Sequence, residues 1–177
     1  MCPRVSNIYS MSSAIQVLMF GWEFPPFING GLGTACYGLT KAMSKKNIHV
    51  TFVLPTLKEG MSVDFVRMVG LNFKVHTISS LLQAYLTSKS YDKAKLNYSG
   101  NFFGKDLYDE VHLYAEKSRA IALMEQYDII HAHDWLTYLA GINAKELSGK
   151  PLVVHIHNTA FDRSGGNPNP LEYEIEK

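Results

Sequence analysis

The sequence contains 177 residues, of which 46% are hydrophobic and 19% charged, and its formal net charge is +1 at pH 7. This length suits one domain or slightly more, with a substantial core, and the near-neutral charge excludes a field strong enough to recruit nucleic acid or an acidic membrane. The two cysteines give no readable disulfide framework, which favours a cytoplasmic protein. No apolar run approaches the roughly 20 residues of a membrane span, and we interpret residues 1–13 as a leader or tail.

The first predicted elements are a strand, a helix and a second strand. Ile15–Phe20 is a short, almost continuous apolar run, as expected for a strand covered on both faces. Apolar residues recur at helical spacing from Leu32 to Lys46. A β-branched strand follows from His49 to Leu54, and we expect Pro55 to end it. This succession has the size of one parallel crossover unit.

The middle of the chain is less regular. Leu71, Phe73 and Val75 alternate with polar residues, which predicts a half-exposed strand with residues 63–68 as its candidate partner. Residues 79–104 are rich in Ser, Tyr, Lys and Asn and show no strong period. We therefore expect a long surface excursion there.

An amphipathic pattern then predicts a helix over Asp106–Gln126. The residues of its apolar stripe are Leu107, Val111, Tyr114, Ala115, Ser118, Ile121 and Ala122. A strand at Ile129–His133, a helix at Trp135–Leu147 and a strand at Leu152–His157 follow.

The alternation of strands and helices predicts an α/β fold with a doubly wound, mainly parallel, Rossmann-like sheet. We expect this domain to span residues 14–170. A loop rich in turn-forming residues follows Asn158. Residues 171–177 are interpreted as the start of a helix that is cut short.

Three glycines follow the first predicted strand, at the turn where parallel α/β sheets usually bind a phosphate. Gly30, Gly31 and Gly33 would let backbone N–H groups approach an anion, and the dipole of the following helix favours negative charge. The spacing matches neither the dinucleotide fingerprint, in which Cys36 takes the third glycine's place, nor a P-loop, in which Leu39 takes the lysine's place. We therefore predict donor phosphate binding without a nicotinamide cofactor; the alternative is a tight turn without a ligand.

Four of the seven histidines form two pairs, His131 with His133 and His155 with His157. Zinc or iron accepts histidine and Asp134 as ligands, but paired residues on one strand lie about 7 Å apart. No further Cys or Glu ligand is nearby in the sequence, so we expect no metal site. His131 and His155 are interpreted as partners of backbone groups in the sheet. His133 and His157 each end a predicted strand, where a neutral imidazole can contact a ligand.

Asp134 lies between the Ile129–His133 strand and the helix that starts at Trp135. It is interpreted either as the N-cap of that helix or as a catalytic acid, and the two roles can coexist. His133 and Asn158 are expected to border the same cleft as the glycine turn. No serine lies in a G-x-S-x-G elbow, so a nucleophilic triad is not supported.

Three ordered stretches carry a family resemblance: FGWEFPPFINGGLGTACYGLTKAMSKKNIHVTFVLP, YDIIHAHDWLTYLAG and VVHIHNTAF. Together they resemble the N-terminal domain of bacterial and archaeal glycogen or starch synthases and their close glycosyltransferase relatives. The resemblance runs from Ile15 to Phe161, with residues 61–104 unplaced. The three motifs identify the superfamily specifically, but they are weaker evidence for which sugar is transferred.

The resemblance implies the GT-B fold, in which two Rossmann-like domains face each other across a cleft. It implies transfer of glucose from ADP-glucose or UDP-glucose to an α-1,4-glucan with retention of configuration, without a metal and with no cofactor besides the nucleotide-sugar donor. By their matching positions, Gly30 and Gly31 contact the donor diphosphate and His157 contacts the donor sugar. Asp134 lines the same cleft, and Glu23 stands where the family often has an acid.

Two residues depart from the family pattern: Ile28 stands where many synthases have lysine, and Leu136 stands where many have histidine. The donor nucleotide therefore stays open, and a related hexosyltransferase with a different acceptor is an alternative. In the family, most contacts to the nucleotide come from a C-terminal domain, which we expect to lie outside this sequence. We accordingly expect this chain alone to be inactive.

The alternative from another class is a noncatalytic carbohydrate-binding or interaction module. In that interpretation, Trp22, Phe24 and Phe27 form an apolar platform for sugar rings. Calorimetry with maltooligosaccharides and with nucleotide sugars would distinguish the module from the enzyme.

Overall fold

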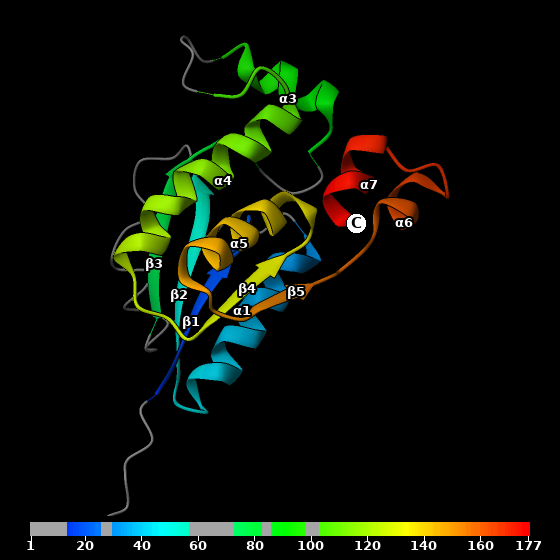
Figure 1. Ribbon diagram of the computed structural model, residues 1–177. Helices are drawn as coiled ribbons and strands as arrows, with labels where there is room; N and C mark the ends of the chain where they lie inside the picture. The colour runs from blue at the N-terminus through cyan, green and yellow to red at the C-terminus, as the bar shows by residue number, and fades with distance from the viewer. Residues whose placement is uncertain (1–13, 26–29, 57–72, 83–85, 98–102) are drawn as a thin grey trace, which may run out of the picture.

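The computed structural model describes residues 14–25, 30–56, 73–82, 86–97 and 103–177. Within these ranges, one sheet of five parallel strands has the order β3-β2-β1-β4-β5 (Figure 1). The strands are β1 (Ile15–Phe20), β2 (Ile48–Thr56), β3 (Phe73–Ser79), β4 (Ile129–His133) and β5 (Leu152–His155). This order reverses between β1 and β4, as in a doubly wound Rossmann-like sheet, and confirms the predicted fold class.

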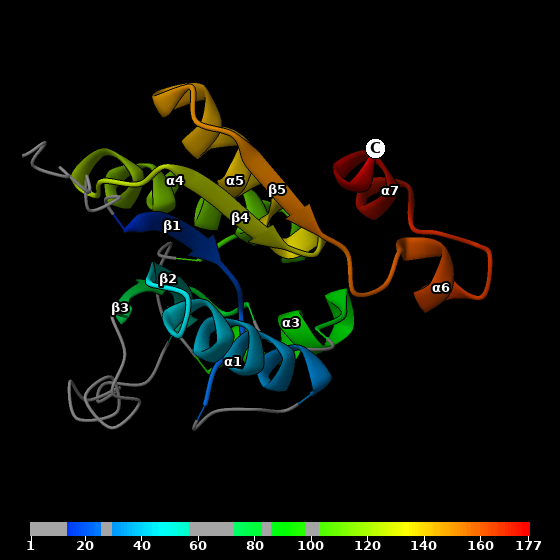
Figure 2. The same cartoon turned by 90° about the horizontal axis from the view of Figure 1, so that it is seen from below.

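Helices cover both faces of the sheet. They are α1 (Gly31–Ser44), α3 (Ser88–Lys95), α4 (Leu107–Met124), α5 (Trp135–Ser148), α6 (Ala160–Ser164) and α7 (Pro170–Glu176). In Figure 2, α1 lies on one side of the sheet, and α4 and α5 lie on the other. Side chains of β1 alternate accordingly: Leu18 and Phe20 pack with α4 and α5, whereas Val17 and Met19 pack with α1. In the described ranges, no helix combines the length and the apolar character that crossing a membrane requires.

The elements with the clearest hydrophobic pattern are confirmed. β1 and β4 have the predicted bounds, and α1 begins one residue before its predicted start. All seven residues of the predicted stripe on α4 are buried. Periodicity was informative here because these elements each bury a continuous face against the sheet or a neighbouring helix.

β2 continues through Pro55 to Thr56, so the prediction that proline ends the strand is wrong. β1 stops at Phe20, opposite Val53, and beyond that point β2 pairs only with β3. A residue without an N–H is tolerated where a strand has an unpaired side. β3 pairs in parallel with β2, and its candidate partner at residues 63–68 lies outside the described residues.

The segment predicted as a surface excursion contributes to the core, which corrects that prediction. Within residues 79–104, Leu81, Leu82 and Leu86 are buried, and α3 carries Tyr91, which has no exposed surface. The rest of α3 is exposed or half-buried. The contribution of this segment to the core was not predictable from its sequence, because it is mostly polar and buries only a few large side chains.

β5 ends at His155, two residues before the predicted end of the strand at His157. The chain then leaves the sheet and forms α6 and α7 beyond the carboxyl end of β5 (Figure 1). A capping box between Thr159 and Asp162 starts α6, so the predicted loop after Asn158 contains a short helix. α7 begins at Pro170, one residue before the predicted start.

Alanine at two helical glycines should have opposite effects on stability. A Cβ atom at Gly141 of α5 would lie 2.9 Å from Cδ1 of Leu152 and 3.0 Å from Cβ of Ala132, whereas one at Gly38 of α1 would meet no atom within 4 Å. Gly141→Ala should therefore lower the free energy of unfolding by about 1–3 kcal/mol. Gly38→Ala should raise it by about 0.5–1 kcal/mol. Urea unfolding measures both changes, and equal effects would contradict the close packing of α5 on the sheet.

Candidate active site

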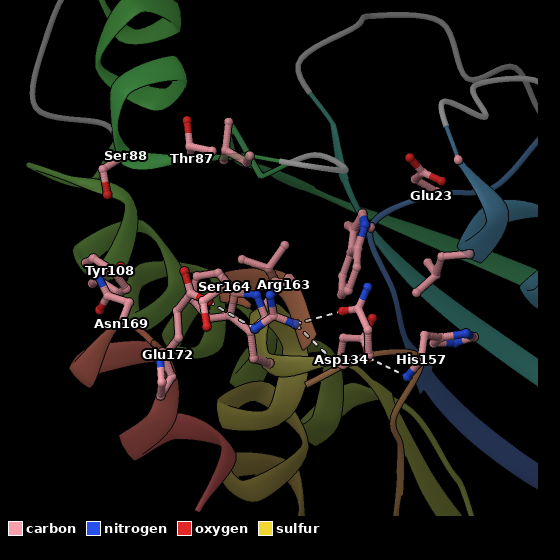
Figure 3. Close-up of a pocket in the computed structure, with 18 of the residues that line it drawn as sticks. Glu23, Thr87, Ser88, Tyr108, Asp134, His157, Arg163, Ser164, Asn169 and Glu172 are labelled. Carbon is pink, nitrogen blue, oxygen red and sulfur yellow. Dashed lines mark hydrogen bonds and ion pairs between the residues drawn. The ribbon is translucent and has the colours of Figure 1, made fainter. Parts of the chain in front are cut away.

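A cavity of about 1110 Å³ lies beyond the carboxyl ends of β1 and β4, where the strand order reverses. The predicted site residues that line it are Glu23, Gly30, Gly31, Asp134, His157 and Asn158. Figure 3 shows Asp134 close to His157, Glu23 further along the same side, and Tyr108 and Asn169 across the cavity. The structure therefore brings the glycine turn and His157 together, although they come from opposite ends of the chain. Their chemical roles stay predictions.

The glycine turn forms the start of α1. Gly30 is the N-cap residue, without a side-chain capping bond, and Gly31 is the first helical residue. Gly33 is buried, and its N–H donates to Oε2 of Glu23 at a distance of 3.2 Å. Because this N–H is already used and Gly33 does not line the cavity, the structure does not place Gly33 as a phosphate ligand.

Glu23 is a buried acid in the wall of the cavity. It is 3% exposed, and its Oε1 atom has no hydrogen-bond partner among the described residues. A buried polar atom without a partner costs about 1–3 kcal/mol, so Oε1 is a candidate acceptor for a ligand hydroxyl. The negative charge of Glu23 also offsets part of the attraction that the start of α1 has for an anion.

Asp134 joins β4 to α5 with an unusual backbone conformation. Its φ of 54° and ψ of 173° are rare for a residue other than glycine, and such strain costs about 1–3 kcal/mol. Oδ1 of Asp134 accepts a hydrogen bond from the backbone N–H of His157 at 2.7 Å. Asp134 is the N-cap residue of α5, as one of the two interpretations predicted, but its side chain makes no capping hydrogen bond to the helix. Burial raises the pKa of Asp134, although the bond from His157 opposes this shift.

His157 lies in the loop after β5, and its imidazole contacts the buried imidazole of His133. Nε2 of His157 is 3.0 Å from Nδ1 of His133, which has no exposed surface and does not line the cavity. The prediction that His133 itself borders the cleft is therefore corrected. Burial lowers the pKa of His157, and burial together with the neighbouring histidines lowers the pKa of His133 to about 2. Both rings are thus neutral near a pH of about 7.

The two predicted histidine pairs meet on one face of the sheet. The register places His133 opposite His155, and ring nitrogens of His131, His133 and His155 all lie within 4.8 Å of one another. Sγ of Cys36 lies 3.7 Å from Nδ1 of His133. A cysteine is therefore close to the histidines in the folded chain, although none is near them in the sequence. Nε2 of His131 has no hydrogen-bond partner among the described residues. The prediction that His131 forms a hydrogen bond with a backbone group is therefore not fulfilled at this nitrogen.

Several residues that line the cavity were not predicted from the sequence. They include Thr87, Ser88, Tyr108 and Arg163. The guanidinium of Arg163 donates to the backbone O of Asn158 at 3.0 Å and to its Oδ1 at 2.8 Å. It also forms ion pairs with Glu172 and Glu176, which tie α6 to α7. The T-x-x-D capping pattern just before Arg163 is the signal that could have located α6.

The aromatic platform expected for a noncatalytic module is not formed as predicted. Phe24 is 1% exposed and packs against Phe52 and Tyr37, with ring centroids 5.0 and 6.1 Å away. Trp22 does line the cavity, and Phe27 lies outside the described residues. Phe24 therefore stabilises the turn on the domain and cannot stack on a sugar ring.

The strand order and the cavity at its reversal point define the class of protein, which is a Rossmann-like α/β domain with a ligand site at the switch point of its sheet. In agreement, a sucrose-phosphate synthase from Thermosynechococcus elongatus has a similar fold, with a TM-score of 0.62 and 11% sequence identity over 92% of this chain and 39% of that chain. The family model of the starch synthase catalytic domain matches residues 16–176. The chain therefore belongs to this family, as its resemblance implied.

Curated relatives agree with this family. An uncharacterized glycosyltransferase of Methanocaldococcus jannaschii is 28% identical over 152 residues, which cover 86% of this chain and 33% of the relative. A glycogen synthase of Pseudothermotoga lettingae is 30% identical over 175 residues, which cover 83% of this chain and 36% of the relative. The chain thus spans about a third of the length of these relatives.

Proposed function

We propose that this chain is the acceptor-side half of a retaining hexosyltransferase that transfers glucose from ADP-glucose or UDP-glucose to an α-1,4-glucan. The observation that carries the proposal is the single cavity lined by both the glycine turn and His157. Its volume of about 1110 Å³ is slightly above the roughly 300–1,000 Å³ of small-molecule sites. This leaves room for a donor sugar together with the end of an acceptor.

The start of α1 is where the donor diphosphate binds in this proposal. Backbone N–H groups at Gly30 and Gly31 and the dipole of α1 favour an anion there, by about 0.3–2 kcal/mol. Neither residue has a side chain that would hold the diphosphate away from the backbone. Because Glu23 binds the N–H of Gly33 in the first turn of the same helix, we infer that basic residues of a second domain complete the diphosphate site.

The donor sugar is held by His157 in this proposal. The neutral imidazole has one nitrogen 3.0 Å from His133, and its other nitrogen contacts the sugar hydroxyls near the reacting carbon in this proposal. Asp134 fixes the backbone of His157 through the 2.7 Å hydrogen bond. The reaction then depends on electrostatic stabilisation of the developing oxocarbenium ion and of the leaving diphosphate.

The test uses the full-length gene product that contains this chain. It is supplied with radiolabelled ADP-glucose or UDP-glucose and maltooligosaccharides, with GDP-mannose as a control donor. We expect glucose transfer from one of the first two donors, an α-linked product by NMR, and no turnover by the isolated chain. Transfer only to other acceptors would indicate a related hexosyltransferase, and glucan binding without transfer would indicate a noncatalytic module. Either result would contradict the proposal.

A further inference from the structure

We propose that His131, His133 and His155 form a binding site for a divalent transition-metal ion such as Zn²⁺. One ligand atom from each residue lies within 4.8 Å of the others. None of the three residues lines the cavity, although His133 contacts His157, so the site adjoins the proposed donor and acceptor positions without overlapping them. The ion would have a structural or regulatory role, because the proposed transfer chemistry uses no metal.

The sheet register brings the three imidazoles to one face. His131 and His133 are two residues apart on β4 and therefore point the same way. Their neighbours Ile130 and Ala132 pack in the core with α4 and α5, so the two histidines point to the α1 side. His155 lies opposite His133 in the parallel pairing of β4 and β5, and adjacent strands are about 4.8 Å apart.

Two ring nitrogens in this cluster are buried without a partner, which is the second observation for the site. His131 is 6% exposed and His133 is 0% exposed. Nε2 of each has no hydrogen-bond partner among the described residues. Leaving such an atom unpaired costs about 1–3 kcal/mol of stability. No contact among the described residues offsets this cost for either Nε2 atom. A metal ion would bind both lone pairs.

The donor set selects the kind of ion. Three imidazole nitrogens without a carboxylate suit Zn²⁺, Cu²⁺ or Ni²⁺, whereas Mg²⁺ and Ca²⁺ prefer oxygen. His155 is half-buried on the edge strand β5 and gives the ion a route from solvent. A water molecule can take the fourth position of a tetrahedral site.

Ion binding requires a rotation of the rings. The ring centroids of His131 and His133 are 4.3 Å apart, and those of His133 and His155 are 4.8 Å apart, in stacked pairs. Zn–N bonds of about 2.0–2.1 Å place tetrahedral ligand atoms about 3.4 Å apart, so the rings must turn about their Cβ–Cγ bonds. With Nε2 of His133 on the metal, Nδ1 keeps its proton and donates to Nε2 of His157. The ion would thereby fix the tautomer of the cavity histidine.

Calorimetric titration of the chelator-treated chain with Zn²⁺ tests the site. The wild type should bind one ion per chain. His155→Gln should weaken binding by about a hundredfold or more, because even outer-shell partners of a ligand contribute about 10–100-fold. The matched control is His112→Gln, since His112 is exposed on α4 and outside the cluster; its affinity should equal that of the wild type. Absence of wild-type binding, full binding by His155→Gln, or equal weakening by both substitutions would overturn the proposal.

A second measurement uses only the wild-type chain and so does not depend on a variant that folds. Histidine ring nitrogens should be followed by ¹⁵N NMR while Zn²⁺ is added. We expect large shifts at the three cluster histidines that are complete at one equivalent, with His112 unchanged. Shifts at His112 alone, or at no histidine, would show that the cluster does not bind the ion.

Discussion

His157→Ala in the full-length protein is expected to lower kcat for sugar transfer by about a hundredfold or more, with the fold retained. Loss of one preorganised group where charge develops in the transition state typically costs about 10²–10³ in kcat. His157 is exposed and lies beyond the end of β5, so removing its ring takes little from the core. Because the interaction strengthens in the transition state, KM should change much less than kcat.

Steady-state kinetics with the accepted donor, together with circular dichroism of the variant, measure this effect. His112→Ala is the matched control, because it removes an exposed histidine of α4 that is far from the proposed chemistry. It should keep the wild-type kcat. A His157→Ala enzyme with nearly wild-type kcat, or one impaired only in KM, would refute the catalytic assignment of His157.

Glu110→Ala is expected to lower the free energy of unfolding by about 3–5 kcal/mol. Glu110 has no exposed surface. Its carboxylate accepts hydrogen bonds from Oγ of Ser80 at 2.5 Å, N of Gly104 at 2.6 Å, the hydroxyl of Tyr91 at 3.0 Å and N of Leu81 at 3.3 Å. Alanine would leave the donors of Ser80, Leu81 and Gly104 without this acceptor, at about 1–3 kcal/mol each before relaxation. The hydroxyl of Tyr91 can still donate to the backbone O of Gly104 at 2.8 Å.

Urea unfolding of the isolated chain measures the loss. Glu116→Ala is the matched control on the same helix, because Glu116 is exposed; it should change stability by no more than about 0.5 kcal/mol. Glu110→Gln should recover only part of the stability, since the amide nitrogen cannot accept the bonds that a carboxylate oxygen accepts. A Glu110→Ala variant as stable as Glu116→Ala would show that this carboxylate does not organise the segments around it.

Hydrophobic periodicity predicted the elements that bury a continuous face, such as Ile15–Phe20 and Ile129–His133. It failed for residues 79–104, because Tyr91 is buried by contacts with distant segments and its neighbours on α3 are polar. The separate expectation that Pro55 ends its strand is also wrong. A proline ends a strand only if the side of the strand that lacks its N–H must pair with a neighbouring strand. Which side is paired depends on the strand order, which the local sequence does not show.

The rule that ligands bind at the carboxyl ends of parallel strands located Asp134 and His157 from the sequence, because these ends meet at one edge of the sheet. Spacing along one strand could not show that His133 lies opposite His155, since the register is set by the whole sheet. Arg163 was missed for a related reason. Its position over the cavity depends on the ion pairs between α6 and α7.

The central strand β1 pairs on one side with β2 and on the other with β4, which begins only at Ile129. During synthesis on the ribosome, β1 therefore has an open edge until β4 has left the exit tunnel, and such an edge invites pairing with other chains. Contacts between segments so distant in sequence also form slowly. A nascent chain can thus bind a ligand only after most of it has been translated, and chaperone protection should matter most before that moment.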